Sequence, residues 1–424
     1  MDVSRRNFLG GALVAAGAVS AATASGARAV QADGGGTAEK RALKATEAYM
    51  AEHRAAWGLP GMTLALVTRD GFSGFAQSGL ADVEREIEVR PDHLFQIGSI
   101  SKMFTALGAW SLIDEGKLSP ETRLSDALAG FSVRGGKAIT LQQLLNHTSG
   151  LPADSALFPE GGLFTGFAPG SNWSYSNCGY ALAGMIAAAA DGRRFDSMVE
   201  ARVLQKLGMT QSAPAIRVAD RARYAQGYEP ALTDRLNPRP GAMTPSPWVD
   251  SDSPAGCLAA TSADMATFMR FLLELADGKG GAVFSDDAAR RFLADPVDGW
   301  GPGAKYGNGV ARVEIDGRKY LHHTGGMVSF CSAMHVDAQA GVAAFASANV
   351  HYSLNYRPSR VTTYACEMVR ALRASAPAPA RKPAKPALAD PSRFAGVFTD
   401  EKGDAFEVVA GEGDISLRRS GRKS

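Results

Sequence analysis

Several common enzyme signatures are missing from this 424-residue sequence. It contains no Gly-x-Ser-x-Gly nucleophile elbow, no His-Glu-x-x-His pair and no Gly-x-x-x-x-Gly-Lys-Ser/Thr loop. These absences argue against an α/β-hydrolase, a zinc protease and a P-loop enzyme. Cysteine and histidine residues do not cluster with the spacing of a metal site either. We therefore expect neither a metal ion nor another cofactor.

An excess of one charge is also lacking. The chain has 45 Lys and Arg against 43 Asp and Glu, a net charge of +2. A nearly neutral protein has no electrostatic basis for binding nucleic acid or an anionic membrane. The apolar content of 45% is ordinary for a soluble globular protein. We expect a small-molecule or short-peptide substrate and no nucleic-acid partner; oligomeric state is left open.

Residues 1–29, "MDVSRRNFLGGALVAAGAVSAATASGARA", are typical of an export signal. A basic start is followed by an Ala/Gly/Val run and a small-x-small site at Ala27–Ala29. Arg5–Arg6 resembles a twin-arginine signal. The apolar run is shorter than the ~18 residues that a bilayer span requires, so a weak membrane anchor is the less favoured alternative. We expect a periplasmic or extracellular protein with no stable anchor after cleavage, which would leave 42 basic and 42 acidic residues.

The scarce cysteines fit this export route. Only four occur, without a Cys-x-x-Cys pair or the spacing of a disulfide framework: Cys178, Cys257, Cys331 and Cys366. Proteins exported by the twin-arginine route usually fold first, so free and buried thiols are expected.

Hydrophobic periodicity predicts strands near both ends of the main domain and helices between them. Helices are predicted from the apolar spacing and the flanking Gly and Pro residues at 38–57, 141–146, 179–190, 197–206, 263–275 and 358–373. Another begins at Ser99, with Met103, Phe104, Leu107 and Trp110 on one face. Asp-Gly turns at 70–71 and 316–317 predict antiparallel hairpins. The pattern predicts an α+β fold in which one antiparallel sheet combines N- and C-terminal strands.

The C-terminal region differs in composition. Residues 374–392 form a Pro/Ala linker, which we expect to be semi-rigid and solvated. Residues 393–424 contain three short predicted strands, too few to bury a core of their own. This β-rich tail is interpreted as an incomplete small domain, a segment that packs on the main domain, or a loose end.

Ser99 and Lys102 are the first candidates for chemistry. A serine hydroxyl needs a base before it acts as a nucleophile, and in a helix Lys102 projects from the same face one turn later. A desolvated lysine drops in pKa and is able to serve as that base. The alternative is that Ser99 only caps the helix. Ser-x-x-Lys also occurs at Ser420–Lys423, so the motif alone is weak.

Two further polar motifs follow. Tyr175 and Asn177 lie in a polar turn before an apolar helix, where a phenol can relay a proton and an amide can orient a carbonyl or a lysine. His323, Thr324, Gly325 and Gly326 end a predicted strand, and the glycines permit backbone amides to approach a ligand. The alternative for His322 and His323 is a surface pair. His147 is isolated and is interpreted as structural.

In this order and spacing, the three motifs resemble those of the serine β-lactamase and penicillin-binding-protein superfamily, specifically its class C-like branch. The phrases "LFQIGSISKMFTA", "ITLQQLLNHTSGLP", "PGSNWSYSN" and "PAGCLAATSADMATFMRFLL" are similar too. The resemblance covers about residues 38–372 and assigns 30–373 to one hydrolase domain. It implies an antiparallel sheet flanked by helices, an all-helical lobe and a site between them.

The resemblance also implies roles for the candidate residues. Ser99 would be acylated, Lys102 and Tyr175 would share general-base and proton-relay work, and Asn177 would hold Lys102 and the substrate amide. The amides of Ser99 and Gly326 would form the oxyanion hole.

One departure narrows the expected substrates. His323 stands where β-lactamases and many carboxypeptidases have lysine, and histidine is mostly neutral at pH 7. Related D-aminopeptidases and esterases carry such a histidine, so we expect small esters or amides, D-amino-acid peptides among them. A β-lactamase or DD-carboxypeptidase is the alternative enzyme, and a non-hydrolytic sensor of cell-wall fragments is the alternative of another class.

Overall fold

The computed structural model describes residues 37–231, 243–385, 387–399, 405–413 and 415–419. The predicted export signal, residues 1–29, lies outside these ranges. In the described part of the chain, no helix combines the length and the apolar character that crossing a bilayer requires.

A nine-stranded antiparallel sheet organises the main domain, in the order β10-β11-β12-β13-β14-β15-β1-β2-β3. Its strands are β1 (Gly61–Thr68), β2 (Ser73–Asp82), β3 (Ile87–Glu88), β10 (Val297–Asp298), β11 (Lys305–Gly307), β12 (Val310–Ile315), β13 (Arg318–Met327), β14 (Phe330–Asp337) and β15 (Val342–Ala348). Strand β1 pairs with β15 from Met62 opposite Ala348 to Thr68 opposite Val342. The prediction that N- and C-terminal strands share one sheet is confirmed.

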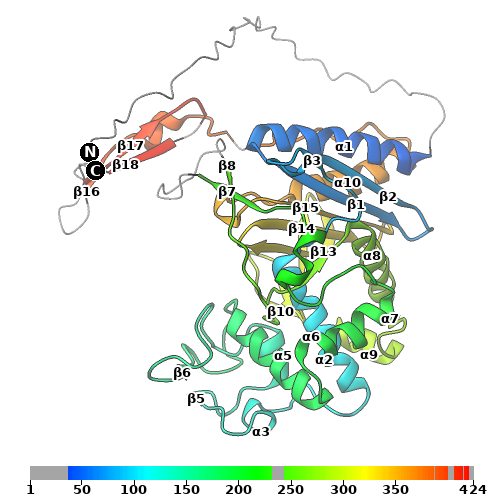
Figure 1. The fold of residues 1–424 in the computed structure, drawn as a ribbon, viewed down its shortest axis with the longest axis vertical. Coiled ribbons are helices and arrows are strands. Elements are labelled where there is room, and N and C mark those ends of the chain that lie inside the picture. The colour runs from blue at the N-terminus through cyan, green and yellow to red at the C-terminus, as the bar shows by residue number, and fades with distance from the viewer. Residues whose placement is uncertain (1–36, 232–242, 386, 400–404, 414, 420–424) are drawn as a thin grey trace, which may run out of the picture. The chain divides into compact units, whose positions relative to one another are not determined.

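Helices cover both faces of this sheet. Helices α1 (Ala38–Trp57) and α10 (Ser359–Arg373) pack together on one face, and α8 (Ser262–Ala276) covers the other (Figure 1). Strand β1 shows the consequence: Leu64 and Leu66 join the core under α1 and α10, whereas Ala65 and Val67 join the core with α8. All eight β1 residues are therefore buried, and apolar residues dominate the strand on both faces.

The sequence sets the ends of these helices. Thr37 caps α1 by accepting a hydrogen bond from the Lys40 amide, and Gly58 ends the helix with a left-handed φ of 62°. The Thr261 hydroxyl accepts from the Asp264 amide at the start of α8. Both helices lie where the apolar spacing predicts them.

The second lobe is inserted between the two halves of the sheet. It contains α2 (Ser101–Asp114), α3 (Leu124–Ala127), α4 (Leu141–Leu145), α5 (Asn177–Asp191), α6 (Phe195–Val199), the π-helical turn η2 (Glu200–Leu204), α7 (Gln205–Leu207) and α9 (Asp286–Phe292). The expectation of an all-helical lobe needs one correction. Strands β5 (Val133–Arg134) and β6 (Leu163–Phe164) form a short parallel pair, and a two-residue strand is too short for a sequence alternation to predict it.

Several further elements are short. They are η1 (Gly98–Ile100), η3 (Val218–Arg223), η4 (Tyr352–Leu354) and the strand pairs β4 (Phe95–Gln96) with β9 (Ala259–Ala260) and β7 (Tyr228–Pro230) with β8 (Met243–Pro245). The predicted long loop, residues 214–256, contains η3, β7 and β8, and its residues 232–242 lie outside the described ranges.

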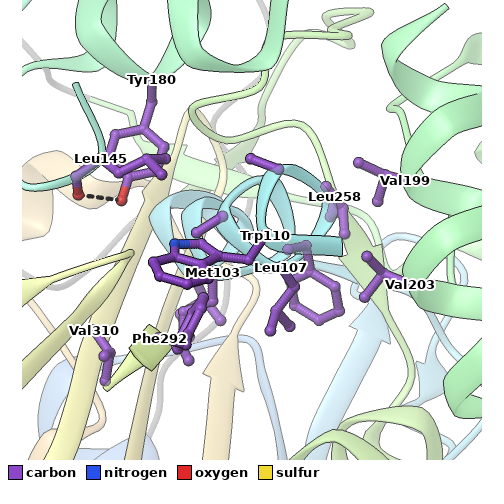
Figure 2. Packing of buried hydrophobic residues seen from close by; sticks show 14 of the residues in the cluster. Met103, Leu107, Trp110, Leu145, Tyr180, Val199, Val203, Leu258, Phe292 and Val310 are labelled. Carbon is purple, nitrogen blue, oxygen red and sulfur yellow. Dashed lines mark hydrogen bonds between the residues drawn. The ribbon is translucent and has the colours of Figure 1, made fainter. Parts of the chain in front are cut away.

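Helix α2 is the centre of the larger core. The prediction of a single apolar face was wrong, because every residue from Ser101 to Ile113 is buried. Figure 2 shows Met103, Leu107 and Trp110 packed among residues from other elements. Trp110 meets Phe292 edge-on, with ring centroids 5.8 Å apart. Neighbours on every side therefore bury α2 all round.

The C-terminal region contains the three predicted strands. They are β16 (Gly396–Thr399), β17 (Ala405–Ala410) and β18 (Ile415–Arg419), which follow the short helix η5 (Pro391–Phe394) and pair antiparallel in chain order. The linker before them contacts α1: the Tyr49 hydroxyl donates to Lys382 O at 2.6 Å, and Trp57 Nε1 donates to Ala384 O at 2.9 Å. These two hydrogen bonds attach the linker to α1, whereas the sequence predicted a semi-rigid, solvated linker. All four cysteines are free and buried, as predicted.

Replacing Leu107 by alanine tests the role of α2 as the central core helix. Leu107 is fully buried, so the cavity should lower the free energy of unfolding by about 2–5 kcal/mol. Chemical denaturation of Leu107→Ala measures this, with Val218→Ala at a side chain that is 60% exposed as the control. Equal loss in both variants would contradict the expectation.

Candidate active site

Ser99 lies in the turn that leads into α2. The turn η1 precedes the helix directly, and no side chain caps its first amides. Instead, Lys102 Nζ lies 3.1 Å from Ser99 Oγ. The capping interpretation of Ser99 is therefore wrong, and the predicted serine–lysine contact is present.

The Lys102 amine is held by two groups that only accept hydrogen bonds. Its Nζ donates to Asn177 Oδ1 at 2.6 Å and to the Ala255 carbonyl at 2.7 Å. A neutral amine has two N–H groups and one lone pair, so these two bonds leave the lone pair to face Ser99 Oγ. Lys102 is thus oriented to take the serine proton.

Burial gives this amine a suitable pKa. Lys102 is completely buried, which lowers its pKa from 10.5 to about 7, while the negative charge of Asp154 opposes part of that shift. A substantial neutral fraction exists at neutral pH, as general-base catalysis requires.

Asn177 fixes the lysine from the first turn of α5. Ser176 caps that helix by accepting from the Gly179 amide at 2.9 Å. The Asn177 Nδ2 group donates to Asp154 Oδ1 at 2.7 Å. Because the carboxylate can only accept, this bond sets the amide orientation and turns Oδ1 toward Lys102.

Tyr175 completes the cluster around Ser99. Lys102 Nζ lies 4.8 Å from the centroid of its ring. Burial raises the Tyr175 pKa, and a hydrogen bond with Ser99 only partly offsets this. The phenol therefore keeps its proton at neutral pH and is able to donate it. His147 packs 4.3 Å from the Tyr175 ring centroid, and its Nδ1 accepts from the Ser176 amide at 3.0 Å, which fixes this turn.

Two glycines allow the serine turn to approach β13. A Cβ on Gly98 would lie 2.6 Å from Gly326 N, and one on Gly325 would lie 2.0 Å from Ile97 O. Gly98 also has a φ of +54°, a conformation that favours glycine. The close approach brings the neighbouring Ser99 amide near Gly326, as the predicted oxyanion hole requires.

His323, also on β13, is buried beneath the contact between the Ser99 turn and this strand. Its Nδ1–H donates to Thr324 O at 2.6 Å, and its Nε2 accepts from the Tyr306 hydroxyl at 3.2 Å. Burial and the nearby Lys102 hold the His323 pKa well below 6.5, so the ring is neutral. The surface-pair interpretation is wrong, since His322 is buried as well and stacks on His335 at 4.2 Å.

A cavity of about 640 Å³ opens over Ser99. Of the predicted residues, Ser99, Tyr175, Asn177, Thr324 and Gly326 line it; Lys102 and His323 lie beneath it. Seven further residues line the cavity that the sequence did not single out: Asp154, Trp173, Trp300, Met327, Val328, Tyr352 and Arg357. Two of them had a local signal: Trp173 lies two residues before Tyr175, and glycines flank Trp300 in "DGWGPG". The others reach the cavity through tertiary folding.

Arg357 changes the charge expected in the cavity. One of its terminal nitrogens donates to Tyr356 O at 2.6 Å and contacts Cys331 Sγ at 3.3 Å. The other lies 3.0 Å from where a Cβ on Gly326 would stand. A permanent cation is thus present beside the predicted oxyanion hole although His323 replaces a lysine.

Within the described ranges, no three His, Cys, Asp or Glu side chains gather in a way that would hold a metal ion. The expectation that neither a metal nor another cofactor takes part stays a prediction.

Comparisons with known proteins agree with this arrangement. The family model described as Beta-lactamase matches residues 46–366. Penicillin-binding protein 4 of Amycolatopsis lactamdurans is 30% identical over 322 residues, which cover 70% of this chain and 82% of that protein. Two further curated relatives are matched over 38% and 51% of their lengths: penicillin-binding protein 4* of Bacillus subtilis, at 31% identity, and a β-lactamase of Pseudomonas fluorescens, at 33% identity.

Two solved structures share the fold. The octameric penicillin-binding protein homologue of Pyrococcus abyssi has a TM-score of 0.69 and 22% identity, covering 90% of this chain and 88% of its own. The D-amino acid amidase of Ochrobactrum anthropi SV3 has a TM-score of 0.63 and 23% identity, covering 79% and 99%.

The Lys102 environment predicts a pH dependence. Only the neutral amine accepts a proton, so kcat/KM for an uncharged ester should rise with pH and reach half its maximum at about pH 7. Asp154→Asn removes a negative charge that raises the Lys102 pKa, so the rise of kcat/KM should move to lower pH in this variant. A profile flat through pH 7, or a shift in the opposite direction, would contradict the assignment.

Gly98 predicts a loss of catalysis without unfolding. The Cβ of Gly98→Ala would push against the Gly326 backbone and displace one amide, which should lower kcat by about a hundred-fold or more. Gly130→Ala is the matched control, since Gly130 also has a positive φ of 82° but nothing within 4 Å. Steady-state kinetics measure the loss of catalysis, and thermal unfolding measures any loss of stability. Similar kcat losses in both variants would refute the predicted role of Gly98.

Proposed function

Since this chain belongs to the beta-lactamase family and is a serine hydrolase, we propose that it is exported and hydrolyses small esters or amides through an acyl-enzyme on Ser99. The observation that carries the proposal is the Lys102 amine, whose two N–H groups are engaged while its lone pair faces Ser99 Oγ. This arrangement activates a serine without a histidine or a metal.

Acylation follows from these contacts. The Ser99 hydroxyl gives its proton to Lys102 Nζ as Oγ attacks the substrate carbonyl. The amides of Ser99 and Gly326 bind the resulting oxyanion. Tyr175 donates its proton to the leaving oxygen or nitrogen and regains one from Lys102, so the carbon–leaving-group bond breaks and an ester on Ser99 remains.

Deacylation reverses the proton path. A water molecule attacks the acyl ester, and the Lys102–Tyr175 pair takes its proton. The tetrahedral oxyanion then collapses, Ser99 Oγ leaves and is reprotonated, and the free acid departs. No cofactor takes part in either half of the reaction.

Asp154 favours an acyl group that carries a free amine. Its carboxylate lines the same cavity as Ser99 and holds Asn177 in place. An ammonium group on the substrate would meet an opposite charge there. This supports a D-aminopeptidase or amidase type of activity, and the D-amino acid amidase among the fold neighbours is consistent with it.

Arg357 supports a second candidate, a β-lactamase or DD-carboxypeptidase. Its guanidinium beside Gly326 offers a charge for a substrate carboxylate. The penicillin-binding protein and β-lactamase relatives point the same way. A non-hydrolytic sensor of wall fragments would acylate once and stall, which the Lys102 base does not favour.

The export signal and its twin-arginine pattern support a periplasmic or extracellular location. The near-neutral charge supports a small-molecule or short-peptide substrate rather than nucleic acid.

The first test is turnover of a D-alanine anilide with a free amine, compared with its N-acetyl form and with a penicillin. We expect steady hydrolysis of the free-amine substrate and, by intact-mass spectrometry, an adduct that Ser99→Ala abolishes. Ser125→Ala, at an exposed serine, is the matched control. A stalled adduct would support the sensor, and preference for penicillin would support the second candidate.

Asp154→Asn makes this test specific. The free-amine preference over the N-acetyl form should fall about ten-fold, as the loss of one partly desolvated ion pair predicts, whereas a weakened hold on Asn177 would lower both rates alike and leave the preference unchanged. An unchanged preference would exclude Asp154 as the ammonium partner.

A further inference from the structure

Trp300 has a backbone conformation that large side chains rarely adopt. Its φ is +76°, in a region that favours glycine. It stands in the loop from Gly299 to Gly303 that joins β10 to β11, with glycines at 299, 301 and 303. Such strain persists only where surrounding contacts determine it, and it is frequent at ligand sites.

Aromatic contacts hold this residue in place. The Trp300 indole stacks on Tyr306, with centroids 5.6 Å apart and planes 13° apart, and lies 4.7 Å from the His323 ring. Trp173 packs against the same loop, because a Cβ on Gly299 would lie 2.6 Å from its indole carbons. Both tryptophans line the cavity over Ser99 and are only partly buried.

The position of Trp300 indicates which part of the substrate it would contact. Its ring lies 6.1 Å from that of Tyr175. Tyr175 hands its proton to the leaving group in the reaction proposed above, so the leaving group must lie within reach of the phenol. Trp300 is therefore next to the leaving group rather than only part of the wall behind it.

We propose that Trp300, supported by Trp173, forms an aromatic surface that binds the leaving group and selects alcohols or amines that carry a flat aromatic or broad apolar group. This inference rests on the proposed function and names the leaving-group class. Aromatic rings prefer offset-stacked or edge-to-face partners, and both tryptophans line the cavity and are only partly buried.

The test compares the benzyl and ethyl esters of free D-alanine. Their alcohols have similar acidity, so a difference in kcat/KM reports binding of the ring. Wild type should prefer the benzyl ester. Trp300→Gly removes the indole yet suits a φ of +76°, and it should lower the benzyl-to-ethyl ratio about ten-fold with the ethyl ester little affected. Trp300→Phe should keep most of the preference.

Controls separate this role from a structural one. Trp248→Ala removes an indole that lines a different cavity and should leave the ratio unchanged. Moving the phenyl group to the acyl side should abolish the dependence on Trp300. Equal losses on both esters in Trp300→Gly, or an unchanged ratio, would overturn the proposal.

A binding measurement tests the role of Trp300 independently of turnover. In the Ser99→Ala background, calorimetry should show the benzylamide of D-alanine binding more tightly than the ethylamide, and Trp300→Gly should remove the difference. If wild type hydrolyses neither ester, the proposed function fails, and this measurement still decides the role of Trp300. Equal binding of both amides before the substitution would refute it.

Discussion

The buried amine of Lys102 is the interaction on which the rest of the site depends. A charged ammonium in this position would be costly, so burial favours the neutral base. Two acceptors from different parts of the chain, Asn177 Oδ1 and the Ala255 carbonyl, then direct the remaining lone pair to Ser99. The cap of α5 and the Asp154–Asn177 bond orient one of those acceptors. Packing of α2 on all sides keeps Lys102 away from water, and this burial keeps the pKa of its amine lowered.

Much of the architecture was predictable because its signals are local and repeated. Helices α1 and α8 follow their apolar spacing and end signals closely, and the antiparallel sheet follows from strand patterns at both ends of the domain. Helix α2 was placed correctly but given one apolar face, since periodicity cannot show how many neighbours cover a helix. The β5–β6 pair was missed because two residues carry no alternation.

The site was predictable only where chemistry is concentrated in short motifs. Ser99, Lys102, Tyr175 and Asn177 meet in the structure, whereas His323 turns away from the cavity toward Tyr306. Strand alternation could have indicated that His323 and Thr324 face opposite sides. Asp154 and Arg357 come from loops whose paths depend on tertiary packing, so their charges could not be assigned to the cleft from the sequence.

The pairing of β1 with β15 has a consequence for synthesis. These adjacent strands are far apart along the chain, with Met62 opposite Ala348, so the central sheet cannot close until the ribosome has released nearly the whole domain. Gly326 on β13 completes the wall opposite Ser99 under the same constraint. Contacts between such distant residues slow folding, and a truncated chain would hold the serine and lysine without the strand that faces them. Assembly of the site is thereby tied to synthesis of the chain through β15.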